Sequence, residues 1–333
     1  MHPPRPATRS GVPFAPRLRV LLAALVALVA SCTDRNPLRP DDAPLGPPSR
    51  LLTATTSVQI ASGAIHGCVL SGDGVASCWG DNTNGQAPAR KTAAPGGSYV
   101  SVSAGRYHTC ALSSAGTVEC WGAGGSGSYA VNSGQAPAVR AATLGTFTQV
   151  SAGFRHTCAL RDDGVAECWG ANTSGQAPMT RAPSSGRFVK VSAGRDHTCA
   201  LRGDGVVECW GYDGTGQAPT ERWSIAGRFT DVSAAYQHTC AINFWSNLEC
   251  WGSGQSGQAP EHAGGLYALY FRQVSTAWEH TCGVMADGSV QCLGQNQYGR
   301  APPSRVAPEG ARYAAVSVGA YHTCALTDRG TVD

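Results

Sequence analysis

The stretch Val150-Ser-Ala-Gly153-Phe-Arg-His156-Thr-Cys158-Ala-Leu160 recurs, with small changes, seven times along this chain. A repeat of about forty residues with short apolar runs and Gly-rich turns is typical of an array in which each unit forms one small sheet. Seven such sheets suit closure into a ring, because closure leaves only short, protected strand edges. The marking histidines lie 42, 48, 41, 41, 42 and 42 residues apart and are His66, His108, His156, His197, His238, His280 and His322.

Each repeat reads as three short strands. The fourth begins at Phe188, passes through His197 and Val206-Val-Glu-Cys-Trp-Gly, and closes with Gly216-Gln-Ala-Pro. β-Branched and aromatic residues broken by Gly at regular intervals favour strands. No segment of a repeat keeps a period of 3.6 residues, so no helix is expected there. One repeat alone is too small to be stable, and the core should lie between neighbouring repeats.

Twelve cysteines fall in pairs that are ten residues apart. In most repeats Asp-Gly or Ala-Gly lies between them, as at Asp163-Gly164, which predicts a three-residue hairpin loop with Gly in the left-handed position. That register sets the two cysteines directly opposite each other, within disulfide range. A metal site shared by His and Cys is the alternative. The predicted disulfides join Cys68 to Cys78, Cys110 to Cys120, Cys158 to Cys168, Cys199 to Cys209, Cys240 to Cys250 and Cys282 to Cys292.

The seventh repeat is shorter than the others. By the same spacing Cys324 would pair with position 334, whereas the sequence given ends at Asp333. Thr331-Val332-Asp333 matches the start of a third strand, as in Thr117-Val118-Glu119. We therefore expect a seventh blade without its last strand, in a sequence truncated at its carboxyl end.

The amino terminus predicts export. Four arginines precede an eleven-residue apolar run, Val20 to Ala30, and small residues lead to Cys32. This pattern is typical of a signal peptide, here residues 1–31, and the run is too short to span a bilayer. The cysteine after small residues resembles the lipobox of bacterial lipoproteins, which implies lipidation of Cys32 and, with Thr33 after it, the outer membrane. Ordinary cleavage with a free Cys32 is the alternative. Residues 32–57 are Pro-rich and read as a tether, and residues 58–333 as the repeat domain.

Charge and motifs exclude several functions. Four basic residues and no acidic one lie in the signal peptide, so the formal net charge falls from +3 to −1 in the remainder. No basic stripe is left for nucleic acid. No catalytic Ser/His/Asp set, carboxylate pair or phosphate-binding glycine loop stands apart from the repeat. We expect a monomer that needs no cofactor or metal, in which each repeated histidine bonds backbone within its own blade.

The repeat resembles that of the regulator of chromosome condensation family. The residues that carry the resemblance are Gly153-Phe-Arg-His156, Asp163-Gly164, Trp169-Gly170 and Gly175-Gln176, and it extends over roughly residues 58 to 333. It implies a seven-bladed β-propeller. Relatives include a guanine-nucleotide exchange factor for a nuclear small GTPase and secreted bacterial propellers that inhibit β-lactamases. The paired cysteines and Gly-Gln-Ala-Pro, where Gly-Gln-Leu-Gly is usual, depart from the eukaryotic pattern.

The two residues before each histidine vary between otherwise similar repeats. They lie in the loop between the first two strands, and the loop after Trp-Gly should open on the same face. In the second repeat that loop is longer, running from Gly122 to Gln135. Aromatic residues and Arg have the composition of binding hot spots, although they could merely cover the blade ends. The predicted partner-binding residues are Tyr107, Phe154, Arg155, Arg195, Tyr236, Trp278 and Tyr321.

These observations predict a surface-anchored binding module that is not an enzyme and that recognises an unknown protein. A carbohydrate-binding propeller would use the same aromatic side chains as stacking platforms. An inhibitor of a secreted enzyme and an exchange-factor-like protein are further alternatives. An enzyme would need a polar cluster in the central channel, which the sequence does not reveal.

Overall fold

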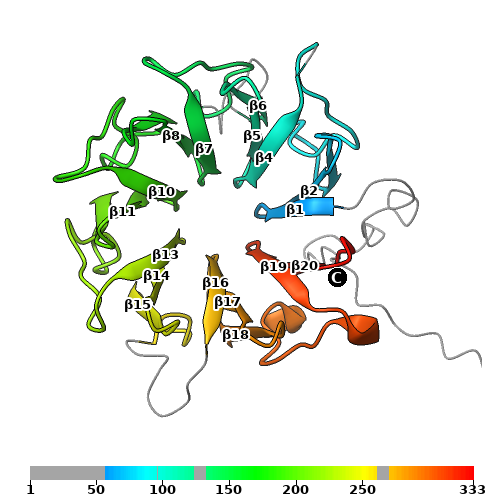
Figure 1. The fold of residues 1–333 in the computed structure, drawn as a ribbon, viewed down its shortest axis with the longest axis vertical. Helices are drawn as coiled ribbons and strands as arrows, with labels where there is room; N and C mark the ends of the chain where they lie inside the picture. Colours follow the sequence, from blue (N-terminus) through cyan, green and yellow to red (C-terminus); the bar gives the residue numbers. More distant parts are fainter. Residues whose placement is uncertain (1–56, 96, 124–132, 261–269) are drawn as a thin grey trace, which may run out of the picture.

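The computed structural model describes residues 57–95, 97–123, 133–260 and 270–333. In this part of the chain the strands form seven antiparallel sheets set radially round one axis (Figure 1). Six sheets have three strands and the seventh has two. The first strand of each sheet lies nearest the axis. The expected all-β, seven-bladed propeller is therefore confirmed.

The blades follow one another in chain order. Blade 1 consists of β1 (Ser57–Ser62), β2 (His66–Ser71) and β3 (Ala76–Gly80); blade 2 of β4 (Tyr99–Ala104), β5 (His108–Ser113) and β6 (Val118–Gly122). Blade 3 consists of β7 (Phe147–Ala152), β8 (His156–Arg161) and β9 (Ala166–Gly170); blade 4 of β10 (Phe188–Ala193), β11 (His197–Arg202) and β12 (Val207–Gly211). Blade 5 consists of β13 (Phe229–Ala234), β14 (His238–Asn243) and β15 (Leu248–Gly252); blade 6 of β16 (Phe271–Thr276), β17 (His280–Met285) and β18 (Val290–Gly294). Two 3₁₀ turns, η1 (Gln297–Gly299) and η2 (Pro308–Gly310), precede blade 7, which is β19 (Tyr313–Val318) and β20 (Thr323–Thr327).

Three strands per repeat account for most of each blade, but the structure adds a fourth extended segment. The amide of Cys209 on β12 donates to the carbonyl of Pro219 at 3.2 Å, and Val207 and Arg222 exchange two backbone bonds. The segment that follows the third strand therefore covers the outer edge of blades 1 to 4 and of blade 6, which protects those edges from pairing with another chain. Equivalent bridges join Ala76 to Lys91, Val118 to Arg140, Ala166 to Arg181 and Val290 to Arg305.

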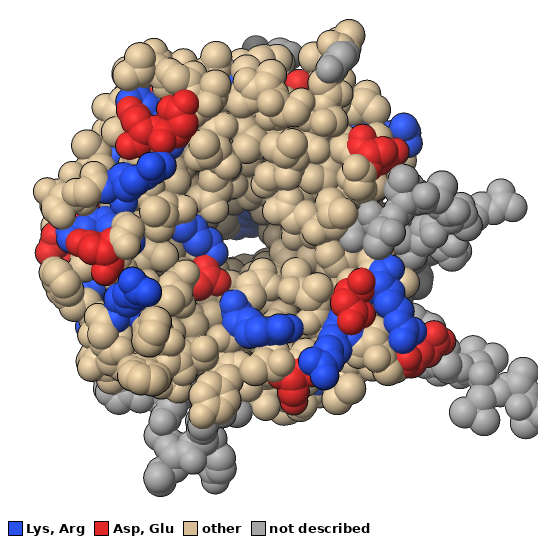
Figure 2. Space-filling view, in the orientation of Figure 1, with Lys and Arg blue, Asp and Glu red and all other residues tan. Residues whose placement is uncertain are grey.

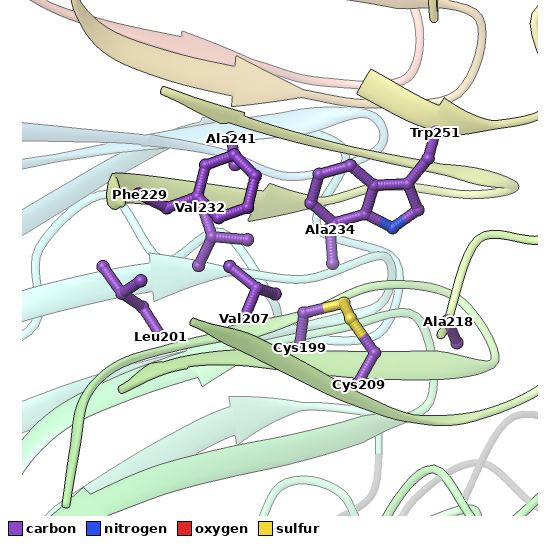
Figure 3. Close-up of a cluster of buried hydrophobic side chains, with 10 residues drawn as sticks. All are labelled: Cys199, Leu201, Val207, Cys209, Ala218, Phe229, Val232, Ala234, Ala241 and Trp251. Carbon is purple, nitrogen blue, oxygen red and sulfur yellow. A yellow bond between two sulfur atoms is a disulfide. The ribbon is translucent and has the colours of Figure 1, made fainter. Parts of the chain in front are cut away.

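The core lies between blades, as expected. Trp251 and Phe229 of blade 5 face the Cys199–Cys209 disulfide of blade 4 (Figure 3). The indole Nε1 of Trp251 donates to the carbonyl of Gln217 at 3.1 Å, so this large apolar side chain leaves no polar atom unpaired. The same bond joins Trp121 to Gln86, Trp169 to Gln135 and Trp210 to Gln176. Each of these four tryptophans thus attaches its blade to the preceding repeat.

The repeated histidines also join blades, and the predicted bond to backbone within the same blade is wrong. The Nε2 atom of His156 lies 2.8 Å from Oγ1 of Thr198 in the next blade. Because that hydroxyl donates to the carbonyl of Gln176, it accepts from the histidine, which sets the Nε2–H tautomer. Blade 1 carries Gly67 in place of this threonine, and Nε2 of His322 accordingly has no hydrogen-bond partner. The periodicity of the sequence could not show which blade supplies the partner.

All six predicted disulfides form, with Cα–Cα distances of 4.0 to 4.1 Å. The register is the expected one, since Cys199 faces Cys209 and Leu201 faces Val207. Each pair occupies a non-hydrogen-bonded position, because the amide of the second cysteine points away to the outer segment. The sulfur atoms are thereby used in covalent bonds, which removes the basis of the His–Cys metal alternative in these blades.

Blade 7 closes the ring against blade 1. The Ser62 amide donates to Oγ of Ser317 at 2.7 Å, and the hydroxyl of Ser62 donates to the carbonyl of Ser317 at 3.0 Å. Val332 forms a bridge to Leu326, so the expected start of a third strand is present. Cys324 is buried and packs with Trp79 of blade 1. The seventh blade, with its two strands β19 and β20, therefore completes the ring.

Several predictions concern residues outside this part of the chain. The signal peptide, Cys32 and its lipid, residues 33–56 of the tether, and most of the long loop of the second repeat lie there. They stay predictions. Among the described residues no helix has the length and apolarity needed to cross a bilayer.

The hairpin turn of blade 5 keeps its register without glycine. In the other blades the third loop residue is Gly with positive φ, for example Gly164 at 83°. In blade 5 that position is Ser246, with φ of 65°, and Ile242 still faces Leu248. A left-handed conformation is unfavourable for a residue with a Cβ atom. The cross-strand disulfide and the core hold the serine in it.

Replacing Ser246 with Gly should stabilise the protein by about 1 kcal/mol, because the strain of the left-handed serine is removed. Chemical unfolding followed by fluorescence measures the change. The matched control is Gly164→Ala, where the added Cβ would lie 2.5 Å from Cβ of Arg187 and the free energy of unfolding should fall. A destabilised Ser246→Gly variant would show that the turn of blade 5 is unstrained.

Candidate functional site

The loops between the first and second strands gather at one end of the channel, and the loop after Trp-Gly opens beside them. The amide of Ala171, which follows Trp169-Gly170, donates to the carbonyl of Arg155 at 2.8 Å. Equivalent bonds join Tyr212 to Asp196 and Gln295 to Glu279. The predicted arrangement of these loops is therefore confirmed. The turns that follow the second strands lie at the opposite ends of the same strands.

These loops form a hydrogen-bonded collar, which we define as the glycines and alanines that precede the variable pairs. The amide of Phe154 donates to the carbonyl of Gly194 at 3.0 Å, and that of Arg195 to Ala235 at 3.0 Å. Gly153 leaves no room for a side chain in the present backbone, because a Cβ on it would lie 2.5 Å from the carbonyl oxygen of Gly194. The collar gives the side chains above it a rigid base.

A cavity of about 340 Å³ opens inside this ring. Six of the seven predicted partner-binding residues line it, and Arg155 does not, since its side chain is exposed beside Phe154. Arg106, which the prediction left out, lines the cavity as well. Arg106 is the first residue of its variable pair, as are Phe154, Tyr236 and Trp278. This shared position could have indicated from the sequence that Arg106 lines the cavity. The predicted residues that line the cavity are Tyr107, Phe154, Arg195, Tyr236, Trp278 and Tyr321.

Aromatic side chains from five blades contact one another in sequence. The ring of Tyr107 lies 6.0 Å from that of Phe154, which lies 6.0 Å from Tyr236. Tyr236 is 5.3 Å from Trp278, and Trp278 is 5.4 Å from Tyr321. Tilted and edge-on contacts at these centroid distances are favourable. We call these five side chains the aromatic arc; the remaining part of the rim, in blade 1, carries Ala64 and Ile65.

Two arginines stack on the aromatic arc. The guanidinium of Arg106 lies 4.1 Å from the ring centre of Phe154 and 4.7 Å from that of Tyr107. The guanidinium of Arg195 lies 4.0 Å from Tyr236, and its Nε lies 3.0 Å from a carboxylate oxygen of Asp196. Stacking of this kind holds a long side chain in place and keeps its charge near the cavity.

The histidines beneath the collar are neutral at physiological pH. Burial lowers the pKa of His108, His197 and His238 to about 3, and that of His156 to about 4. Their side chains are fully buried and the Nδ1 atoms have no hydrogen-bond partner. The hydrogen bond from each of these histidines to a threonine hydroxyl joins two blades, and the histidine side chains do not line the cavity.

The channel and the outer faces carry mixed charges. Lys190 pairs with Asp231 across neighbouring inner strands. Figure 2 shows one end of the ring, hollowed at its centre, where basic and acidic side chains lie beside one another without a continuous stripe of one sign. Among the residues that the structure describes, no group of three His, Cys, Asp or Glu side chains could hold a metal ion. The aromatic arc and its two arginines are therefore the candidate binding site.

A family model described as "Regulator of chromosome condensation (RCC1) repeat" matches residues 58–86, 99–128, 147–176, 188–217 and 271–300. Solved structures with the same fold include the CRINKLY WD40 ectodomain of the Arabidopsis thaliana receptor kinase ACR4, which is 24% identical and has a TM-score of 0.60 over 83% of this chain and 93% of that one. Prp20p from Saccharomyces cerevisiae is 16% identical, with a TM-score of 0.68 over 82% and 84%. Human WBSCR16 is 18% identical, with a TM-score of 0.68 over 83% and 88%.

No curated protein matches the chain. The solved structures are all below 25% identical, so they show a similar fold and nothing more. The family model matches the residues that recur in each repeat. Gly153, His156, Trp169 and Gln176 are those residues in the third repeat, and the structure places each of them in contacts between blades or in turns. In these five matched segments and in its propeller fold, the chain is similar to proteins with the regulator of chromosome condensation repeat.

Proposed function

We propose that this protein is an extracytoplasmic binding module without catalysis of its own, and that a protein partner docks on the end of the ring that carries the aromatic arc. The observation that carries the proposal is the cavity there, lined by Tyr107, Phe154, Tyr236, Trp278 and Tyr321 and set on a rigid collar. Aromatic residues and arginine dominate the energetics of protein interfaces, because they bury a large area at low cost in conformational entropy.

Several features support location outside the cytoplasm. Six disulfides between adjacent strands are typical of proteins made in an oxidising compartment. The signal-peptide pattern agrees, and two solved structures of the same fold are ectodomains of receptor kinases. We further propose that a lipid on Cys32 anchors the domain to the bacterial outer membrane.

A protein partner fits the site better than a glycan does. Sugar rings stack on open aromatic faces, whereas Arg106 lies against Phe154 and Arg195 against Tyr236. The rings of Tyr236 and Trp278 also pack against each other. A mixed surface of rings, arginines and rigid backbone is that of a protein interface.

Truncating Trp278 to Ala should weaken partner binding by about 2 kcal/mol or more, which is roughly thirtyfold in Kd. The partner would be isolated with the immobilised domain from outer-membrane extract, purified, and titrated against each variant by calorimetry.

The control changes Phe244 and Trp245 to Ser in the turn of blade 5, at the other end of the strands. These side chains are 53% and 62% exposed, so their replacement should leave both folding and affinity nearly unchanged. If the Phe244/Trp245 variant loses the partner and Trp278→Ala keeps it, the partner docks on the opposite face. Capture of glycans alone would favour the carbohydrate-binding alternative.

A further inference from the structure

The guanidinium of Arg106 lies against two aromatic rings and has no hydrogen-bond acceptor among the described residues. Its central carbon, Cζ, lies 4.1 Å from the ring centre of Phe154 and 4.7 Å from that of Tyr107. Among the described residues its side chain makes no hydrogen bond or ion pair with any acceptor. The hydrogen atoms of a guanidinium lie in its plane, so aromatic stacking does not satisfy them. A half-buried arginine at the wall of a cavity thus keeps its in-plane donors for a ligand.

A second arginine lies near the same ring. Arg195 is 5.6 Å from the centre of Phe154, and its Nε lies 3.0 Å from a carboxylate oxygen of Asp196. The terminal nitrogens of Arg195 have no other acceptor among the described residues. Of the two guanidinium groups only that of Arg195 is paired with a carboxylate, which leaves net positive charge at the aromatic wall of the cavity. Charge of that sign, partly shielded from water, attracts an anion more strongly than it would on an open surface.

The shape of the cavity limits what can enter. Loops from all seven blades surround it, and its volume is about 340 Å³. An α-helix, which is about 10–12 Å across with its side chains, does not fit that space. One side chain at the tip of a protruding loop does, with its methylene groups against Phe154.

We propose that this cavity is a carboxylate subsite, which receives an Asp or Glu side chain from the tip of a loop on the partner protein. Arg106 and Arg195 donate to the two carboxylate oxygens, since planar donors and a planar acceptor suit paired hydrogen bonds. The stacked rings hold Arg106 in place before the ligand arrives, which lowers the entropic cost of binding. The proposal rests on the proposed function, because it names the chemistry of the partner at the same site.

The experiment compares two disulfide-closed hairpin peptides that differ only in the turn, Gly-Glu-Gly in one and Gly-Gln-Gly in the other. Each is titrated into the full-length protein by calorimetry. We expect the Glu peptide to bind at least tenfold more tightly than the Gln peptide, with Kd no weaker than about 1 mM. Arg106→Gln should abolish that difference. The matched control, Arg155→Gln, changes an exposed arginine beside the same phenylalanine but outside the cavity lining, and it should preserve the difference.

Three results would overturn the proposal. The two peptides could bind with equal Kd, neither could bind with a Kd below about 1 mM, or the preference for the Glu peptide could remain in the Arg106→Gln variant. Free glutarate, titrated in parallel, separates a small carboxylate from a loop tip. If glutarate binds as tightly as the Glu peptide, the occupant is a small acid and the loop-tip proposal fails. The proposed function is tested separately by Trp278→Ala with the isolated partner, so loss of affinity there together with equal peptide binding would leave the interface in place and remove the carboxylate subsite.

Discussion

Lowering the pH from 7 to 5 should destabilise the folded protein by an amount comparable to the whole stability of an ordinary domain. Burial lowers the pKa of His66, His197 and His280 to about 3 and of His156 and His322 to about 4, against 6.5 when exposed. The unfolded chain therefore takes up protons below pH 6.5 that the folded protein does not. Stability is then full above pH 6.5 and falls as the pH drops toward 4.

The size of this loss in stability follows from the number of buried histidines. Each histidine contributes about 1.4 kcal/mol per pH unit within that window. Seven of them together lose on the order of 10 kcal/mol by pH 5, and whole domains are stable by about 5–15 kcal/mol. Thermal unfolding between pH 8 and 4.5 should show a steep fall in Tm below pH 6.5. Calorimetry at pH 5.5 in two buffers of different ionisation enthalpy should show uptake of several protons on unfolding.

His156→Asn supplies the control for this prediction. It removes one titrating group, so uptake should fall by about one proton per molecule whatever the variant's absolute stability. A Tm that stays level between pH 7 and 5 would mean that these histidines are hydrated or already protonated in the folded protein.

Reduction of the disulfides should unfold the protein or leave it close to unfolding at 37 °C. Each bond closes a loop with its cysteines ten residues apart, which stabilises by about 3 kcal/mol in the chain-entropy model. Six such bonds sum to roughly 15 kcal/mol or more in that model, the same size as the margin of a stable domain. Denaturant unfolding of oxidised protein and of protein reduced in denaturant and then refolded measures the difference.

The double variant Cys199→Ala/Cys209→Ala isolates one bond. Because blade 4 keeps its strands and its neighbours, the free energy of unfolding should fall by about 3 kcal/mol while the other five bonds form. Mass spectrometry of unreduced protein should find the predicted pairs with ten-residue spacing. Free thiols at those positions, or a bound metal in their place, would contradict the assigned register.

Predictions from the sequence succeeded wherever one repeat contains both partners of a contact. Cys199 and Cys209 lie on one hairpin, so spacing and turn type determine their register. Even Ser246 in place of glycine left the pairing of blade 5 unchanged, because the strands on either side specify it. The prediction that the variable pairs and the loop after Trp-Gly lie at the same end of the blade is confirmed for the same reason, since strand direction reverses at each turn.

Contacts between repeats were beyond the sequence. The bond from His156 to Thr198 joins residues of different blades, and a pattern that is identical in every repeat cannot show which copy supplies the partner. At the cavity, Arg106 and Arg155 looked alike as members of variable pairs, and Arg106 was left out in favour of Arg155. The direction in which each side chain leaves its loop decides which one lines the wall.

The amino-acid sequence by itself determined the number of blades, the three strands in each of the first six, the disulfide register and the face on which variable residues gather, because these depend on local spacing and turn geometry. Only the tertiary structure decided that histidines and tryptophans join neighbouring blades, that five aromatic side chains contact one another, and that Arg106 keeps its donors beside a cavity. Those features require residues from different repeats to meet at one axis. Ring closure brings them together, and no stretch of the chain contains that information alone.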